Sequence, residues 1–173
     1  MSVVYSSRLG AGRGCVVSSR LCQLAARLCN ELKDLDHVVG RVQEGWRRVK
    51  LSSDDYYLDG VALNLHSFYA GLERMFELIA VAIDGGRPEG ENWHQALLLQ
   101  VSTESPPARP AVISESVRRR LDEYRGFRHV VRNVYTFKFD AQKIEKLVED
   151  MPFLFTEVRA EIGAFAEFLK HRG

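Results

Sequence analysis

Residues 54–84 read DDYYLDGVALNLHSFYAGLERMFELIAVAID and indicate the fold class. Apolar side chains recur every three or four residues along this stretch, which places them on one face of an α-helix. They are Leu58, Val61, Ala62, Leu65, Phe68, Tyr69, Leu72, Phe76, Ile79 and Ile83. The pair Gly85-Gly86 follows, with Pro88 soon after, as is typical of a helix end. We therefore predict a long helix over about residues 54–84 that buries one face in a helical core.

The same periodicity continues on both sides of this stretch, and strand patterns are scarce. Ser114 and Asp140 are suited to cap helices at their N-termini. The other predicted helices cover about residues 17–50, 93–101, 114–138 and 140–170, the last interrupted at Pro152. Long helices joined by short connections pack antiparallel. The sequence therefore predicts an all-α protein, an up-and-down bundle of four to five helices.

Length and composition fit a single domain. The chain has 173 residues, of which 46% are hydrophobic and 27% are charged, and a chain of this size can bury a core without a metal or a disulfide. Residues 1–16 are rich in Ser, Gly and Arg, and we predict a flexible N-terminal tail there, with one helical domain over residues 17–173. No run is long and apolar enough to span a membrane, so we expect no membrane partner and a cytoplasmic location.

Charge and cysteine content limit the classes of function. The net charge is +1, so any contact with a polyanion must come from a local patch. Cys15, Cys22 and Cys29 are spaced by seven residues, on one side of a helix where they cannot pair within the chain. We interpret them as small apolar residues on a packed face, in a reducing compartment. We expect neither a metal site nor a cofactor.

A cationic helix follows at residues 123–140, EYRGFRHVVRNVYTFKFD. At about 100° per residue, its polar residues gather on one side and Phe127, Val130, Val131, Val134 and Phe137 fill the other. The polar residues are Arg125, Arg128, His129, Arg132, Asn133 and Tyr135, and no acid lies among them. Such a face is either simply solvated or binds an anion such as a phosphate, because uncompensated like charges destabilise a helix. Arg118, Arg119 and Arg120 extend this patch by one turn.

Polar residues of the helix predicted at 54–84 border this patch. Asp59, His66 and Glu73 recur at a spacing of seven, about 10 Å apart along a helix, which is too far to chelate one ion. We interpret them as the polar edge of that helix, although Tyr69 and Glu73 are also placed to orient the arginines. We interpret His94 as a loop-packing residue.

The segment FRHVVRNVY at 127–135 resembles the signature helix of HEPN-class proteins, in particular the HepT-like ribonuclease toxins. Their pattern is an Arg, four to six further residues, a His, and a Tyr two positions after that His. Arg128 matches the Arg, Asn133 stands where the His belongs, and Tyr135 matches the Tyr. The blocks LNLHSFYAGLERMFELIA, NWHQALLLQ and RPAVIS are similar to the same family, so the resemblance extends from about Tyr56 onward.

The resemblance implies a HEPN-like bundle and a metal-independent endoribonuclease toxin. It implies a composite active site at a homodimer interface, where the signature helices of two copies meet. Arg128, His129 and Asn133 become the candidate catalytic residues, and Arg125 and Arg132 become candidate ligands of the RNA phosphate. The implied partner is an MNT-type nucleotidyltransferase antitoxin that silences the toxin by transferring AMP to Tyr135.

Asn133 departs from the family pattern, because an amide cannot accept and return a proton near neutral pH. Three explanations remain open. His129, one turn earlier, performs the proton transfer; or Asn133 and the arginines only stabilise charge and cleavage is slow; or cleavage is lost and binding is kept. The last corresponds to an alternative function, a catalytically silent helical subunit that docks to a nucleotidyltransferase. A plain structural scaffold is the third possibility.

Overall fold

The computed structural model describes residues 11–52, 54–133, 135 and 138–172. Within these ranges the chain forms five α-helices and one π-helical turn, and no β-strand. None of these helices combines the length and apolar content needed to cross a bilayer. The elements are α1 (Ala11–Leu51), α2 (Tyr56–Ile79), η1 (Ala80–Asp84), α3 (Trp93–Ser102), α4 (Glu115–Asn133) and α5 (Ala141–Arg172).

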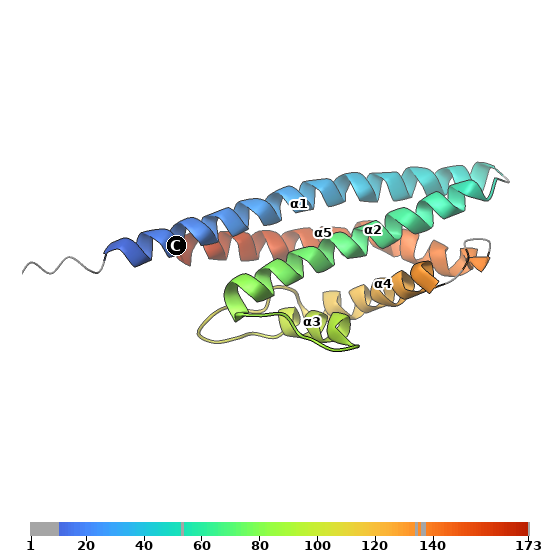
Figure 1. The fold of residues 1–173 in the computed structure, drawn as a ribbon. Helices are drawn as coiled ribbons and strands as arrows, with labels where there is room; N and C mark the ends of the chain where they lie inside the picture. The colour runs from blue at the N-terminus through green and yellow to red at the C-terminus, as the bar shows by residue number, and fades with distance from the viewer. Residues whose placement is uncertain (1–10, 53, 134, 136–137, 173) are drawn as a thin grey trace, which may run out of the picture.

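The long helices alternate in direction, which confirms the predicted up-and-down bundle. α2 runs back along α1, α4 runs beneath α2, and α5 returns along α1 (Figure 1). The short α3 lies beside α4, near the end of α2 where the chain turns (Figure 1). This arrangement brings α2, α3 and α4 together at one side of the bundle.

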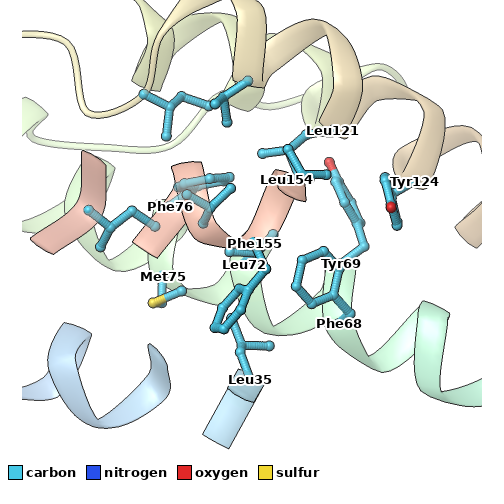
Figure 2. Close-up of a cluster of buried hydrophobic side chains, with 14 of the residues drawn as sticks. Leu35, Phe68, Tyr69, Leu72, Met75, Phe76, Leu121, Tyr124, Leu154 and Phe155 are labelled. Atoms are coloured by element: carbon cyan, nitrogen blue, oxygen red, sulfur yellow. The ribbon is translucent and has the colours of Figure 1, made fainter. Parts of the chain in front are cut away.

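Side chains from four helices meet in the core. Figure 2 shows a central cluster in which Phe68 of α2 lies near Tyr124 of α4 and Phe155 of α5, with ring centroids 5.6 and 6.0 Å apart. The Tyr124 hydroxyl donates to the Leu147 carbonyl oxygen at 2.7 Å, which joins α4 to α5. The buried residues of α4 are Val117, Leu121, Tyr124 and Phe127. The rotation of α4 is thereby fixed, and Arg125, Arg128 and Arg132 lie on the side that faces α3.

The predicted interruption at Pro152 is wrong, because α5 is continuous. A proline lacks the amide that would donate to the carbonyl four residues earlier. Here that carbonyl, of Val148, accepts a hydrogen bond of 2.9 Å from the Gln43 side chain of α1. A side chain from a neighbouring helix thus replaces the missing donor, and the helix continues through the proline.

Other helix ends also differ from the predictions. α1 begins at Ala11 instead of about Val17, and the rest of the predicted tail lies outside the described residues. α4 ends at Asn133 instead of near Lys138. Val130, predicted on the packed face, is 38% exposed. The reason is that the core side of α4 centres on Tyr124 and Phe127, while Val130 faces a groove between α4 and α5.

The interpretation of the cysteines as packed residues is only partly right. Cys29 is half-buried against the core, but Cys22 is exposed. The buried face of α1 in this region follows Leu24, Ala25 and Leu28, and Cys22 falls outside it. The Cys15 side chain lies outside the described residues.

A buried arginine fixes the loop between α3 and α4. Arg109 pairs with Asp84 through two hydrogen bonds of 2.8 and 2.7 Å. It also donates to the carbonyl oxygens of Gln100, Thr103 and Pro110. Since Asp84 ends η1, this contact ties the end of α2 to the end of α3. The loop therefore holds α3 in place against α4.

Candidate functional site

Arg128 of α4 is contacted by residues from two other helices. Its Nη2 lies 3.4 Å from Glu73 Oε2 of α2, and its Nη1 lies 3.2 Å from His94 Nε2 of α3. Glu73 is only 4% exposed. A carboxylate is rarely so buried unless it has a charged or hydrogen-bonding partner, and Glu73 has both Arg128 and His94. The three side chains form one connected group at the junction of α2, α3 and α4, which we call the Glu73–His94–Arg128 triad.

The hydrogen bonds of the triad fix the state of the imidazole. His94 Nδ1 lies 2.5 Å from Glu73 Oε1. An ionised carboxylate only accepts and a guanidinium only donates. His94 therefore donates from Nδ1 to Glu73 and accepts at Nε2 from Arg128, which assigns it as neutral with its proton on Nδ1.

Neighbouring residues hold the His94 ring in place. His94 lies in the first turn of α3, and its ring packs on that of Trp93 with centroids 3.6 Å apart. The Arg87 guanidinium in turn lies over the Trp93 ring, 4.6 Å from its centroid. The imidazole is therefore fixed by packing as well as by Glu73.

Arg128 has an unused donor. Its Nε is buried and has no hydrogen-bond partner among the residues that the structure describes. A buried donor without an acceptor costs about 1–3 kcal/mol, so such atoms are uncommon in folded proteins. The two terminal nitrogens of the guanidinium thus contact Glu73 and His94, whereas Nε still lacks an acceptor among the described residues. An oxyanion that reached this position would supply the missing acceptor.

A pocket of about 430 Å³ opens beside the triad, between the start of α3 and the C-terminal half of α4. We call it the α3–α4 pocket. Its lining residues are Glu91, Asn92, His94, Gln95, Arg125, Arg128, His129, Arg132 and Asn133. Its volume lies within the range of about 300–1,000 Å³ that is usual for small-ligand sites. All five catalytic and phosphate-binding candidates from the sequence line this one pocket.

The prediction that these arginines lack acidic neighbours is wrong for two of the three. Asp122 accepts a hydrogen bond of 2.6 Å from Arg125 Nε, and Glu73 pairs with Arg128 from α2. The first partner lies just before the segment 123–140, and the second becomes a neighbour only through folding. In the described part of the chain, Arg132 alone of the three has no carboxylate within ion-pair distance, and it is exposed.

The arginines one turn earlier do not extend the patch. Arg118 and Arg119 both pair with Glu115, at 2.6 and 2.9 Å. Arg120 pairs with Asp150 and Glu157 of α5, at 2.7 and 2.9 Å. These three arginines are therefore engaged by carboxylates outside the α3–α4 pocket.

Of the remaining sequence candidates, His129 and Asn133 line the pocket, and Tyr135 is not among its lining residues. His129 is exposed, and the Asn133 amide donates to the His129 carbonyl oxygen at 2.8 Å and lies 3.3 Å from His129 Nδ1. Asn133 is thus engaged with its own helix. Tyr135 lies two residues beyond the end of α4 and is 73% exposed. Its ring is accessible from outside the molecule.

Two side chains of α2 respond to the charges of α4. Burial lowers the pKa of the His66 imidazole, and the positive charges of Arg128 and Arg132 lower it further. Burial, helped by the negative charge of Glu73, raises the pKa of the Tyr69 phenol far above its ordinary value. Tyr69 therefore stays protonated, and the pKa of His66 depends on the charges of Arg128 and Arg132.

His94 is the site residue that the sequence did not reveal. The suggestion that Glu73 orients an arginine from a neighbouring helix is confirmed. His94 does pack against Trp93, as expected, but it also lines the α3–α4 pocket and contacts both Glu73 and Arg128. No spacing in the sequence connects residues 73, 94 and 128, because their helices meet only in the folded bundle.

These features define an all-α protein with a cationic pocket between its third and fourth α-helices. The family model described as "HepT-like protein" matches residues 60–169, which include the whole triad. The chain belongs to this family, which is a toxin family of the HEPN type, and the resemblance seen in the sequence is confirmed. The search of curated proteins and the search of solved structures gave no match.

Proposed function

We propose that this chain is an endoribonuclease toxin that cleaves RNA in the α3–α4 pocket without a metal ion. The observation that carries the proposal is the state of Arg128. Its guanidinium is pre-positioned by Glu73 and His94 and keeps a buried Nε without an acceptor, in a pocket that also holds the uncompensated Arg132. This is the environment that a phosphodiester would complete.

The proposed reaction is an internal transesterification. The ribose 2′-oxygen forms a bond to phosphorus, the bond from phosphorus to the 5′-oxygen breaks, and the products carry a 2′,3′-cyclic phosphate and a 5′-hydroxyl. One group must take the proton of the 2′-hydroxyl, and the leaving oxygen must gain one. Negative charge builds up on the phosphate oxygens in the transition state, where fixed guanidinium groups stabilise it.

Each candidate residue has a role in this reaction. Arg128 stabilises the charge on the reacting phosphate, and Arg132 binds it or a neighbouring phosphate. Arg125 contributes less, because Asp122 already accepts its Nε–H. Asn133 donates to the substrate the amide hydrogen that is not bound to the His129 carbonyl oxygen, and His129 lies within reach as a proton-transfer group at the pocket mouth.

We propose further that two copies combine their α4 helices, so that each pocket is completed by the partner copy. The exposed Val130 lies on the side of α4 that faces the groove with α5, and an exposed apolar side chain there supports a contact between copies along this helix. The proposed cytoplasmic partner is an MNT-type nucleotidyltransferase that transfers AMP to Tyr135. The exposure of that ring supports access by an enzyme, and a phosphate added near Arg132 would neutralise the pocket.

A catalytically silent binding subunit is the second candidate. It is favoured by Asn133, which stands where the family pattern has His and whose amide is occupied by the His129 carbonyl oxygen. On this view the chain docks to the nucleotidyltransferase and the pocket binds without cleaving.

A cleavage assay in EDTA separates the two candidates. We expect the wild-type chain to generate 2′,3′-cyclic phosphate ends and Arg128→Ala to lose at least a hundredfold in rate, because a charge-stabilising group is removed. Arg119→Ala is the matched control, since Arg119 lies on the same helix, is 75% exposed and pairs with Glu115 outside the pocket. Background cleavage by all three proteins would reject the nuclease and leave the binding subunit.

A further inference from the structure

We infer that His94 is the proton-transfer residue of this site, supplied by α3 in place of the histidine that α4 lacks at Asn133. This inference rests on the proposed ribonuclease function and assigns its base to a residue outside the signature helix. Glu73 acts through His94 and is a positioning residue.

The first support is the orientation of the ring. Glu73 Oε1 lies 2.5 Å from His94 Nδ1, which leaves the lone pair on Nε2. A buried carboxylate that fixes the tautomer and orientation of an imidazole also stabilises the imidazolium once a proton is taken up. Nε2 points to Arg128, and His94 lines the α3–α4 pocket. The base therefore lies beside the guanidinium that we assign to the phosphate.

His129 lacks this support. Its ring is exposed, and the amide of Asn133 lies 3.3 Å from its Nδ1. An amide donor on the imidazole does not stabilise a positive charge there. Within the described residues, no carboxylate forms a hydrogen bond or an ion pair with the His129 side chain, whereas His94 has Glu73. Of the two histidines that line the pocket, His94 is the one equipped to hold a proton temporarily.

The second support is the way in which Arg128 occupies Nε2. The distance from Arg128 Nη1 to His94 Nε2 is 3.2 Å, that from Nη2 to Glu73 Oε2 is 3.4 Å, and Nε has no acceptor within the described part of the chain. These are long contacts for a charged donor, whose hydrogen bonds are usually about 2.7–2.9 Å. A phosphate offers Arg128 better acceptors and draws the guanidinium off Nε2. Binding of substrate thus frees the lone pair for the 2′-hydroxyl.

The step balances without a metal or an oxidant. His94 Nε2 takes the proton of the 2′-hydroxyl as the bond from O2′ to phosphorus forms. The bond from phosphorus to O5′ breaks, and the leaving oxygen takes a proton from water. The imidazolium, paired with Glu73, then returns its proton to solvent and restores the neutral ring.

Chemical rescue tests the inference. We expect His94→Ala to lower kcat at least a hundredfold in EDTA, as loss of a general base does, with KM within a few-fold of wild type. Added imidazole, which fits the space left beside Glu73 and the pocket, should restore at least a tenth of the lost rate. His37→Ala, at an exposed histidine of α1 outside the pocket, is the matched control and should keep its rate within about threefold. A purely structural role of His94 predicts no recovery in imidazole.

The outcomes separate this inference from the proposed function. If wild type and His37→Ala cleave and His94→Ala cleaves equally well, His94 is not the base and the ribonuclease stands. Loss without recovery in imidazole likewise overturns the assignment of proton transfer. If wild type cleaves no faster than Arg128→Ala, both the ribonuclease and its base are rejected. If thermal unfolding shows that His94→Ala is unfolded, His94→Gln replaces it, and an unchanged kcat in that variant overturns the inference.

Discussion

Glu73 and Arg128 form a largely buried ion pair that joins α2 to α4 beneath the α3–α4 pocket, with Oε2 and Nη2 3.4 Å apart. The same carboxylate holds His94 through its other oxygen. We predict that Glu73→Gln lowers the free energy of unfolding by about 1–3 kcal/mol, less than for a fully enclosed pair because the pocket admits water to Arg128. Urea denaturation followed by circular dichroism measures the change.

A double-mutant cycle checks that the pair is the cause. In the Arg128→Gln background, Glu73→Gln should lower the free energy of unfolding by clearly less. The reason is that this background no longer contains the buried positive charge that Glu73→Gln leaves without a partner. Glu77→Gln on the same helix is the control, since Glu77 pairs with Arg87 at the surface and should change stability by at most about 0.5 kcal/mol. Equal costs of Glu73→Gln in both backgrounds would contradict the proposed coupling.

His66 gives a measurable pH dependence. Its folded-state pKa is lowered, first by burial and then by Arg128 and Arg132, below its ordinary value of 6.5. As the pH falls through 6.5, the unfolded chain binds a proton that the folded chain resists, so this residue reduces stability on the acid side. This loss of stability develops as the pH falls from 6.5 to the lowered folded-state pKa, and His66→Gln should remove it. Urea denaturation at several pH values tests this, with the exposed His37→Gln as control.

The same histidine reports ligand binding. A phosphate or an oligonucleotide in the α3–α4 pocket neutralises the two arginines that lower the His66 pKa. We therefore expect the NMR titration midpoint of His66 to rise towards 6.5 in saturating phosphate. A His66 midpoint that does not move when ligand is bound would place the anion away from Arg128 and Arg132.

The two outer arginines should differ in their contribution to RNA affinity. Arg132 is exposed, and Arg125 gives its Nε–H to Asp122 at 2.6 Å. We predict that Arg132→Gln weakens binding of a non-cleavable 2′-deoxy oligonucleotide about tenfold, or about 1.4 kcal/mol, and Arg125→Gln by less. The slope of log affinity against log salt should fall by about 0.7 for each phosphate that the variant no longer neutralises. Fluorescence anisotropy at several salt concentrations measures both quantities.

Arg119→Gln serves as the control for charge alone. Arg119 lies on α4 but pairs with Glu115 outside the pocket. If Arg119→Gln and Arg132→Gln weaken binding equally, affinity follows the net charge of the chain and owes nothing to the pocket.

The helical periodicity was sufficient to predict the bundle, because each helix buries one stripe and the stripes are local in sequence. Phe68, Tyr69, Leu72 and Phe76 were predicted on the core face of α2 and are buried there. Helix ends were less predictable. α5 continues through Pro152 because Gln43, more than a hundred residues earlier in the chain, replaces the missing donor.

The site was predictable only where it lies on one helix. Arg125, Arg128, His129, Arg132 and Asn133 were grouped by their angular positions, and they line one pocket. His94 was not placed in the site, because nothing in the sequence brings α3 against α4. That contact depends on the buried Arg109–Asp84 pair and on the packing of the connecting loop. The compensation of Arg128 by Glu73 is likewise a property of the folded chain.

The continuity of α5 provides a last prediction, independent of the pocket. Gln43→Ala leaves the Val148 carbonyl oxygen without its donor at a partly buried position, so we expect a loss of about 1–2 kcal/mol in the free energy of unfolding. In the Pro152→Ala background the new amide reaches that oxygen, and the same Gln43→Ala change should cost less than about 0.5 kcal/mol. Gln23→Ala, at an exposed position of α1, corrects for the helix propensity gained with alanine. Urea denaturation of the four proteins of the cycle decides the matter: additive effects would mean that Gln43 does not substitute for the proline's missing amide.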